Sequence, residues 1–341
     1  MDAVLWETLA FIVKAVVVFV TFAACVLVFA VRIRGGRGDA EPRLQVERLN
    51  DKLQRRLDTL RLNLLDRKDA KRYLKELKAR DKQAERAPNR VFVLDFKGDI
   101  LASRVEQLRD EVTAVLGVAD PGDEVLVRLE SPGGAAPSYG LAAAQLARFR
   151  PRDIRLTVAV DRVAASGGYM MACVADHIAL APFAILGSIG VAAPLPNVHR
   201  LLRRIGVDYE DATAGTYKRT VSPLAEVTEE GRAKFQEQLD ELHTLFKQFV
   251  KDHRPTLDID RVATGEAWVG RRALELGLAD AITTSDDLVL TRIESHDVYR
   301  VWIERPKSVA EKLSGGAETL VGRLADAVSD GLRQRLARRA L

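Results

Sequence analysis

The sequence predicts an α/β fold with a mainly parallel sheet, preceded by a transmembrane helix and an amphipathic helical segment. Strand-like apolar runs alternate with helical patterns from Arg90 onward, glycine motifs follow several of these runs, and a long apolar segment stands near the start. Strands that alternate with helices are typical of parallel sheets, because each parallel connection needs a crossover. With 341 residues, 47% of them hydrophobic, the chain is long enough for one large or two ordinary domains.

The apolar segment runs from Leu9 to Val31 and contains a single charged residue, Lys14. A helix of this length spans about 34 Å, enough to cross a bilayer. A cleaved signal peptide fits less well, because the preceding residues are acidic and the apolar run is long. We therefore expect a retained single-pass anchor in the inner membrane. The arginines after it would place the rest of the chain in the cytoplasm by the positive-inside rule.

The segment after the anchor is basic. Residues 32–90 contain 19 Lys/Arg and 10 Asp/Glu, whereas the whole chain has a net charge of +4. A lipid surface is the expected partner of this segment; nucleic acid is not expected, because interleaved aromatic residues are missing. Residues 44–86 are expected to be helical, with apolar residues at heptad-like spacing: Val46, Leu49, Leu53, Leu57, Leu60 and Leu64. This stripe could pack on its own domain, self-associate or lie on lipid headgroups.

The pattern divides the chain into four parts: an anchor at 1–33, a basic helical linker at 34–89, an α/β domain at 90–285 and an extension at 286–341. The extension is expected to end in an amphipathic helix. Within the α/β domain, strands are expected at 91–96, 124–129, 154–160 and 177–180, and helices at 105–116, 137–149, 166–174, 197–205 and 228–253.

Three short glycine motifs stand at or near the ends of predicted strands. They are Glu130–Gly134, Ala165–Gly168 and Leu186–Gly190. In open α/β sheets, sites form where strands hand over to helices, so we expect the three motifs to share one edge of the sheet. Glycines there let a substrate approach the backbone closely.

Ser166 and Lys218 are the candidate catalytic pair. Ser166 stands at the predicted start of a helix, and Lys218 follows 52 residues later. In a Ser–Lys hydrolase the serine attacks and the lysine takes its proton. The N–H of Gly167, with that of Gly133 or Gly134, would form the oxyanion hole.

The lysine needs an apolar environment to act as a base, because a lysine in water has a pKa of about 10.4. The uncharged run Ile178–Pro196 is expected to supply an apolar wall. Its prolines and glycines make a second membrane span a poor interpretation and favour a buried strand and turn.

The sequence offers alternatives to Ser166 and Lys218 as catalytic residues. Ser131 and Ser188 are reserve nucleophiles, and Ser188 is more plausible as a contact to the substrate or the lysine. A Ser-His-Asp triad with Asp176 or His177 is disfavoured, because Ser166 has no GxSxG surroundings and adjacent strand residues face opposite ways. The histidines and cysteines are scattered, so no metal or other cofactor is expected.

Five motifs together resemble the signal peptide peptidase family of serine proteases, most closely its SohB-type membrane branch. The motifs lie at Glu130–Gly134, Asp161–Tyr169, Leu186–Val191, Gly215–Lys218 and Thr264–Gly270, the last followed by Ala273–Asp280. The resemblance implies a Clp/crotonase-like fold with Ser166 as nucleophile and Lys218 as general base. It also implies ring-like homo-oligomers, in which the lysine can come from a neighbouring subunit.

The same resemblance implies substrates and a location. Family substrates are membrane-embedded peptides, such as cleaved signal peptides, or misfolded proteins. Family members usually hold the catalytic domain outside the cytoplasm, which conflicts with the positive-inside rule and leaves the side of the domain open. A crotonase-type acyl-CoA enzyme and a catalytically inactive membrane scaffold are the competing functions.

Overall fold

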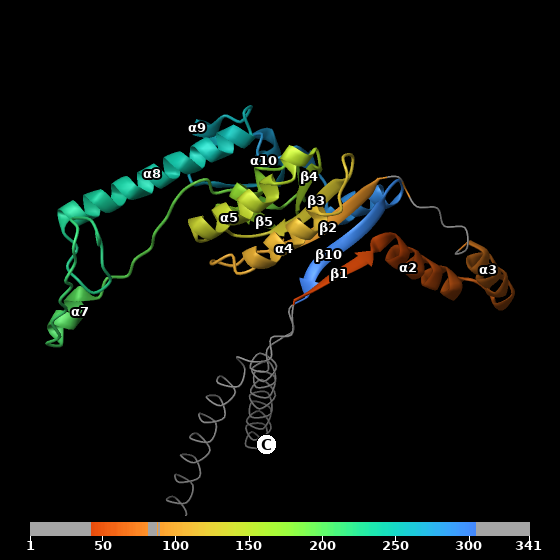
Figure 1. Cartoon of the computed structure of the whole chain (residues 1–341), viewed down its shortest axis with the longest axis horizontal. Coiled ribbons are helices and arrows are strands. Elements are labelled where there is room, and N and C mark those ends of the chain that lie inside the picture. The colour runs from red at the N-terminus through yellow and green to blue at the C-terminus, as the bar shows by residue number, and fades with distance from the viewer. Residues whose placement is uncertain (1–41, 81–86, 88, 305–341) are drawn as a thin grey trace, which may run out of the picture. The chain divides into compact units, whose positions relative to one another are not determined.

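The computed structural model describes residues 42–80, 87 and 89–304, and Figure 1 labels many of their helices and strands. A compact unit spans Leu44–Ile303. The predicted anchor at Leu9–Val31 and the predicted C-terminal helix at 318–341 lie outside the described residues. Among the helices that are described, none is long and apolar enough to cross a bilayer.

A seven-stranded sheet forms the centre of the compact unit, as the sequence predicts. Its order is β1-β10-β2-β3-β4-β6-β9, and each neighbouring pair from β10 to β9 is parallel. The strands are β1 Arg43–Arg48, β10 Asp297–Glu304, β2 Arg90–Lys97, β3 Glu124–Glu130, β4 Arg155–Val160, β6 His177–Leu180 and β9 Ala281–Ile282. Near-continuous apolar runs in β2 and β3 suit this sheet, because both of its faces are covered.

The two faces of β2 enter different clusters of the core. Phe92, Leu94 and Phe96 pack in the larger cluster, together with side chains of α4 (Val105–Leu116), α5 (Ala136–Ala147) and α6 (Gly167–Ala172). Val91 and Val93 pack on the other side, against Leu49 of α2 (Leu49–Leu64) and residues of α11 (Ser285–Ile293). This division follows from the alternation of side chains along a strand.

A smaller three-stranded sheet stands at the end of the large one and was not expected from the sequence. It contains β5 (Val163–Ala165), β7 (Ile185–Gly187) and β8 (Ala267–Val269); β5 and β7 are parallel, and β8 is antiparallel to β7. The run 178–196 contains most of β6, a turn and β7, as the interpretation of strand and turn predicts, but residues 192–196 after β7 are exposed and not buried.

Four described helices lie between β7 and β9. They are α7 (His199–Arg204), α8 (Glu229–His253), α9 (Ile259–Val262) and α10 (Gly270–Glu275). Thr228 caps α8, because its hydroxyl accepts the N–H of Gly231 at 3.0 Å. Near its C-terminal end, α8 buries Phe246 and Val250 in the core.

The prediction of a helix over residues 44–86 is wrong at the start of this segment and in its middle. Arg43–Arg48 is the edge strand β1, and the helical part is divided into α2 and α3 (Arg67–Arg80). The break has a local cause: Leu65 is extended, and the carboxylate of Asp66 accepts the N–H groups of Lys68 and Asp69 at the start of α3.

Strands β1 and β10 belong to the same sheet as β2, although they lie outside the predicted bounds 90–285 of the α/β domain. A side-chain bond also crosses the upper bound, since the hydroxyl of Ser285 donates to Asp161 at 2.5 Å. The division of the chain into four parts stays a prediction.

Glu111 of α4 is a buried carboxyl that faces β10. Its side chain accepts the N–H of Ile303 at 2.9 Å, and the residue is 1% exposed. Burial raises the pKa of Glu111 to about 7, above the usual carboxyl value of 4.5. The folded protein therefore holds this proton more tightly than the unfolded chain does.

We expect Glu111→Gln to change how stability depends on pH. A raised folded pKa contributes stability below the unfolded value of 4.5, and this contribution is lost as the pH rises through about 7. Glutamine keeps an acceptor for Ile303 and never ionises. Urea unfolding should therefore show that, above pH 7, the free energy of unfolding of the variant exceeds that of the parent by up to about 3 kcal/mol. Near pH 4.5, the pKa of the carboxyl in the unfolded chain, the two proteins should differ little. An equal effect at both pH values would contradict the assignment.

Candidate active site

Ser166 stands between strand β5 and helix α6 in an unusual backbone conformation. Its φ is 52° and its ψ is −119°, although it is not a glycine. Its N–H donates to the carbonyl of Gly187 at 2.8 Å, and its own carbonyl accepts the N–H of Met170 at 3.0 Å. Positive φ at a non-glycine residue persists only where the surroundings enforce it, and such strain is common at functional sites.

The three glycine motifs meet at Ser166, as predicted. Ser131 forms a parallel bridge with Ala164, in which its N–H donates to Val163 at 2.8 Å and its carbonyl accepts from Ala165 at 3.0 Å. Ala165 is also paired with Gly187 across β5 and β7. Main-chain hydrogen bonds thus join all three motifs at the carboxyl ends of β3, β5 and β7.

Gly133 is packed directly against Ser166. It has a φ of +89°, and a Cβ at this position would lie 2.6 Å from the Cβ of Ser166 and 2.9 Å from the nitrogen of Gly167. Only a glycine fits both the conformation and the space. Its N–H donates to the hydroxyl of Ser131 at 3.1 Å, so it is already paired.

Two of the three predicted oxyanion donors remain available. Within the described part of the chain, the N–H groups of Gly134 and Gly167 have no hydrogen-bond acceptor. Gly134 is exposed, and Gly167 is the first residue of α6. Free N–H groups beside a serine are the arrangement that stabilises an oxyanion. The geometry thus favours Gly134 over Gly133 as the partner donor of Gly167.

Behind this glycine loop lies a buried chain of hydrogen bonds that the sequence did not predict. The Ser131 hydroxyl is 2.6 Å from that of Tyr139, which donates to the carbonyl of Asp99 at 2.7 Å. Because Tyr139 has one hydroxyl proton, Ser131 must donate to it while accepting from Gly133. The only sequence signal was a tyrosine within an alanine-rich helix, eight residues after Ser131.

Ser131 is therefore a poor reserve nucleophile. Its side chain is fully buried, and its hydroxyl is engaged on both sides. Ser188, the other reserve, is partly exposed and lies directly after Gly187, whose carbonyl binds Ser166. Ser188 has a φ of +50°, and its N–H donates to Glu266 at 2.6 Å. Its role as a contact to the substrate or the lysine stays a prediction.

Among the described residues, no hydrogen bond joins Lys218 to Ser166 within one chain. It lies in the irregular segment between α7 and α8, is exposed, and donates its N–H to Gly215 at 3.1 Å. In residues 42–80, 87 and 89–304, no hydrogen bond or ion pair involves its side-chain amine. The expected apolar wall from residues 178–196 therefore does not bury this lysine in the single chain.

The contacts around Lys218 are local. Tyr217 donates to Glu230 in the first turn of α8 at 3.3 Å, and Arg219 forms an ion pair with Asp211 at 2.7 Å. These bonds hold the segment to α8 and to itself, and they leave the lysine in water.

Asp176 and His177 have structural roles at the other edge of the sheet. Asp176 accepts the N–H of Leu156 at 2.9 Å, and the ring of His177 lies 4.0 Å from Asp280. Both stand at the amino end of β6, whereas Ser166 follows β5, which comes after the carboxyl end of the parallel neighbour β4. The fold thus excludes a triad of these two residues with Ser166.

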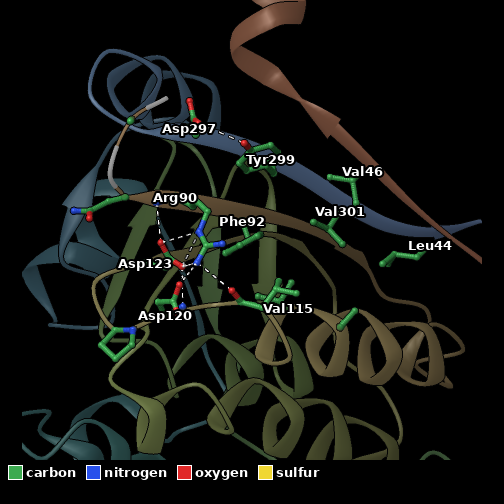
Figure 2. Close-up of a pocket in the computed structure, with 15 residues that line it drawn as sticks. Leu44, Val46, Arg90, Phe92, Val115, Asp120, Asp123, Asp297, Tyr299 and Val301 are labelled. Atoms are coloured by element: carbon green, nitrogen blue, oxygen red, sulfur yellow. Dashed lines mark hydrogen bonds and ion pairs between the residues drawn. The ribbon is translucent and has the colours of Figure 1, made fainter. Parts of the chain in front are cut away.

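A hollow at the edge of the large sheet, shown in Figure 2, is separate from Ser166. It lies at the amino ends of β2 and β3, among β1, β10 and the end of α4. The Arg90 guanidinium lines the hollow. It donates hydrogen bonds to Asp123 and, at 2.7 Å, to Asp120. Its apolar wall includes Val46 and Val301. The charged groups are paired with each other, so the hollow shows no arrangement suited to hydrolysis.

Two family models match the chain over most of its length. The model described as Peptidase family S49 matches residues 148–298, and the model described as Peptidase family S49 N-terminal matches residues 3–146. Ser166 and Lys218 fall in the first match, and the Gly133–Gly134 loop falls in the second.

Named relatives agree with these matches. The probable protease SohB of Haemophilus influenzae is 57% identical over 228 residues, which are 67% of this chain and 65% of that protein. The putative protease SohB of Buchnera aphidicola subsp. Baizongia pistaciae is 42% identical over 287 residues, which are 79% of this chain and 82% of that protein. A solved mutant of a 1510-N membrane-bound stomatin-specific protease, in complex with a substrate peptide, is 16% identical with a TM-score of 0.42; the match covers 66% of this chain and 95% of that one.

The three glycine motifs around Ser166, the two family matches and the identity to the SohB proteins all agree. This chain belongs to peptidase family S49 and is similar to its SohB-type members.

Proposed function

We propose that this chain is a membrane-anchored serine endopeptidase with a Clp/crotonase-like fold, in which Ser166 is the nucleophile and Lys218 the general base. One observation carries the proposal: Ser166 is held at positive φ next to the free N–H of Gly167 and packs against Gly133, whose neighbour Gly134 has a second free N–H. Membership of a peptidase family supports the reaction class.

The proposed reaction has two halves. The Lys218 amine takes the proton of the Ser166 hydroxyl, whose oxygen attacks the peptide carbonyl. The N–H groups of Gly134 and Gly167 stabilise the resulting oxyanion, and the lysine returns the proton to the leaving amine. Water then attacks the acyl–serine ester by the same route and releases the second product.

We infer that the base reaches Ser166 from a neighbouring subunit of a homo-oligomer. Lys218 is exposed in the single chain, yet a lysine needs an apolar environment to be a base near neutral pH. The preceding stretch exposes apolar side chains, with Leu201 57%, Ile205 63% and Val207 45% exposed. Burial of such a surface against a second copy would also desolvate the lysine.

The proposed substrates are signal peptides or other membrane-associated and misfolded polypeptides. An anchor at Leu9–Val31 would hold the site near lipid, in an inner (cytoplasmic) membrane protein with a single span. An alkaline phosphatase fusion after Leu341 identifies the side of the peptidase domain, since the reporter is active only outside the cytoplasm.

Replacing the nucleophile tests the reaction class. We expect Ser166→Ala to lower kcat for a peptide substrate by at least about 10³-fold and to abolish labelling by a serine-directed phosphonate probe. A crotonase-type acyl-CoA enzyme or an inactive scaffold would give no serine-dependent proteolysis in the parent chain. Unchanged turnover in the variant would exclude Ser166 as the nucleophile.

Mixing variants tests where the base comes from. Ser166→Ala and Lys218→Ala chains should each be inactive alone. After dissociation and co-assembly, a mixed oligomer contains sites that combine Ser166 of one chain with Lys218 of the other. We expect it to regain part of the activity, about a quarter of the parent for random pairing. An inactive mixture in oligomers shown to be mixed would place both residues in one chain.

The buried hydroxyl chain behind the glycine loop is expected to position it. Tyr139→Phe removes one hydroxyl but keeps the ring that packs on Gly167. We predict a kcat about tenfold lower with little change in KM, because the oxyanion donor is displaced and not lost. A variant that loses stability while kcat stays at the parental value would show that the chain of bonds is structural only.

A further inference from the structure

Helix α2 starts inside the folded unit and then leaves it. Asn50 fixes the start, since its side chain donates to the carbonyl of His296 and accepts the N–H of Val298, both at 2.8 Å. Beyond this point the leucines are increasingly exposed: Leu57 is 37%, Leu60 58% and Leu64 78% exposed. None of the described residues of α2 is buried.

The exposed leucines of α2, Leu57, Leu60 and Leu64, share one face of the helix with the half-buried Leu53. At about 100° per residue, Leu53, Leu57, Leu60 and Leu64 fall within an arc of about 60°. We call these four residues the leucine row. Arg56 and Arg61 flank the row, each about 40° beyond one of its edges.

Helix α3 packs on a different face of α2 and leaves Leu57, Leu60 and Leu64 of the leucine row exposed. The hydroxyl of Tyr73 donates to Asp58 at 2.7 Å and accepts from Arg61 at 3.1 Å. Asp58 lies about 130° around the helix from the centre of the leucine row. The two helices therefore form a hairpin whose contact face is separate from its apolar face.

The hairpin is strongly basic. Residues 49–80 contain 11 Lys/Arg and 5 Asp/Glu. On α3, four cations fall within an arc of about 100°. They are Arg67, Lys68, Lys71 and Lys75, and none of them forms an ion pair with another described residue.

Charge decides between the two candidate occupants of the leucine row. A second copy would bring two hairpins of the same net charge together, with the cost of like-charge repulsion. An anionic lipid surface would neutralise the charge while leucines enter the acyl boundary, and the flanking arginines can extend to the headgroups. A row of leucines flanked by arginines is the pattern of an interfacial helix.

We propose that the α2–α3 hairpin is an interfacial membrane-binding element that lies on anionic phospholipid through the leucine row. This contact is additional to the predicted transmembrane anchor and does not depend on catalytic activity.

A dye at the leucine row of the full-length chain tests the proposal. Cys25→Ser removes the cysteine of the predicted span, and Cys173 is buried. In this background, Leu64→Cys carries a polarity-sensitive fluorophore, and Arg55→Cys on the opposite side of α2 is the matched control. Each labelled chain is reconstituted in vesicles of phosphatidylcholine alone or with phosphatidylglycerol.

We expect a blue shift at position 64 only with phosphatidylglycerol, no shift at position 55, and loss of the shift when Lys68, Lys71 and Lys75 are changed to Glu. Circular dichroism and the melting temperature of each variant confirm that it is folded. Equal emission in both lipids would overturn the proposal. So would a shift in phosphatidylcholine that grows with protein density, because that result assigns the row to a second copy.

Discussion

The site depends on a few main-chain hydrogen bonds that join the end of β3 to β5 and β5 to the turn after β7. The residue after β3, Ser131, exchanges bonds with Val163 and Ala165, and Ser166 donates to Gly187. These bonds bring three loops from distant parts of the sequence to one point and hold Ser166 at positive φ. These bonds are made by backbone groups. The geometry of the site therefore depends on short strands that align the backbone and on glycines that let it approach closely.

This framework gives each glycine of the loop a different task. Gly133 leaves room for Ser166, and its N–H is bound by Ser131, whereas Gly134 keeps a free N–H. The proposed base, Lys218, is exposed on a segment attached to α8. A single chain therefore contains the proposed nucleophile and oxyanion donors without a desolvated lysine beside them. The proposed oligomer follows from that incompleteness.

Much of the central fold could be predicted, because a long run of apolar residues can be recognised from neighbouring positions in the sequence alone. The runs at 91–96 and 124–129 predicted β2 and β3, and the predicted helix at 105–116 has the bounds of α4. Strands β5 and β7 were missed because three residues are too few to show a period. Strand β1 was missed because Val46 also fits a helical spacing. The motifs predicted that three glycine loops meet around Ser166, but the bonds of Ser131 and Tyr139 depend on tertiary contact, which no local pattern reveals.

The most direct test that Lys218 reaches Ser166 from a neighbouring subunit is a cysteine crosslink between chains. A Ser166→Cys chain and a Lys218→Cys chain, both carrying Cys25→Ser, are co-assembled and oxidised, and Cys173 is buried. If Lys218 reaches Ser166 from a neighbouring subunit, a disulfide-linked dimer with one chain of each kind will form, because paired cysteines must have Cα atoms within about 7 Å. A double variant that closes an intrachain disulfide as a monomer, with no crosslink between the single variants, would contradict it.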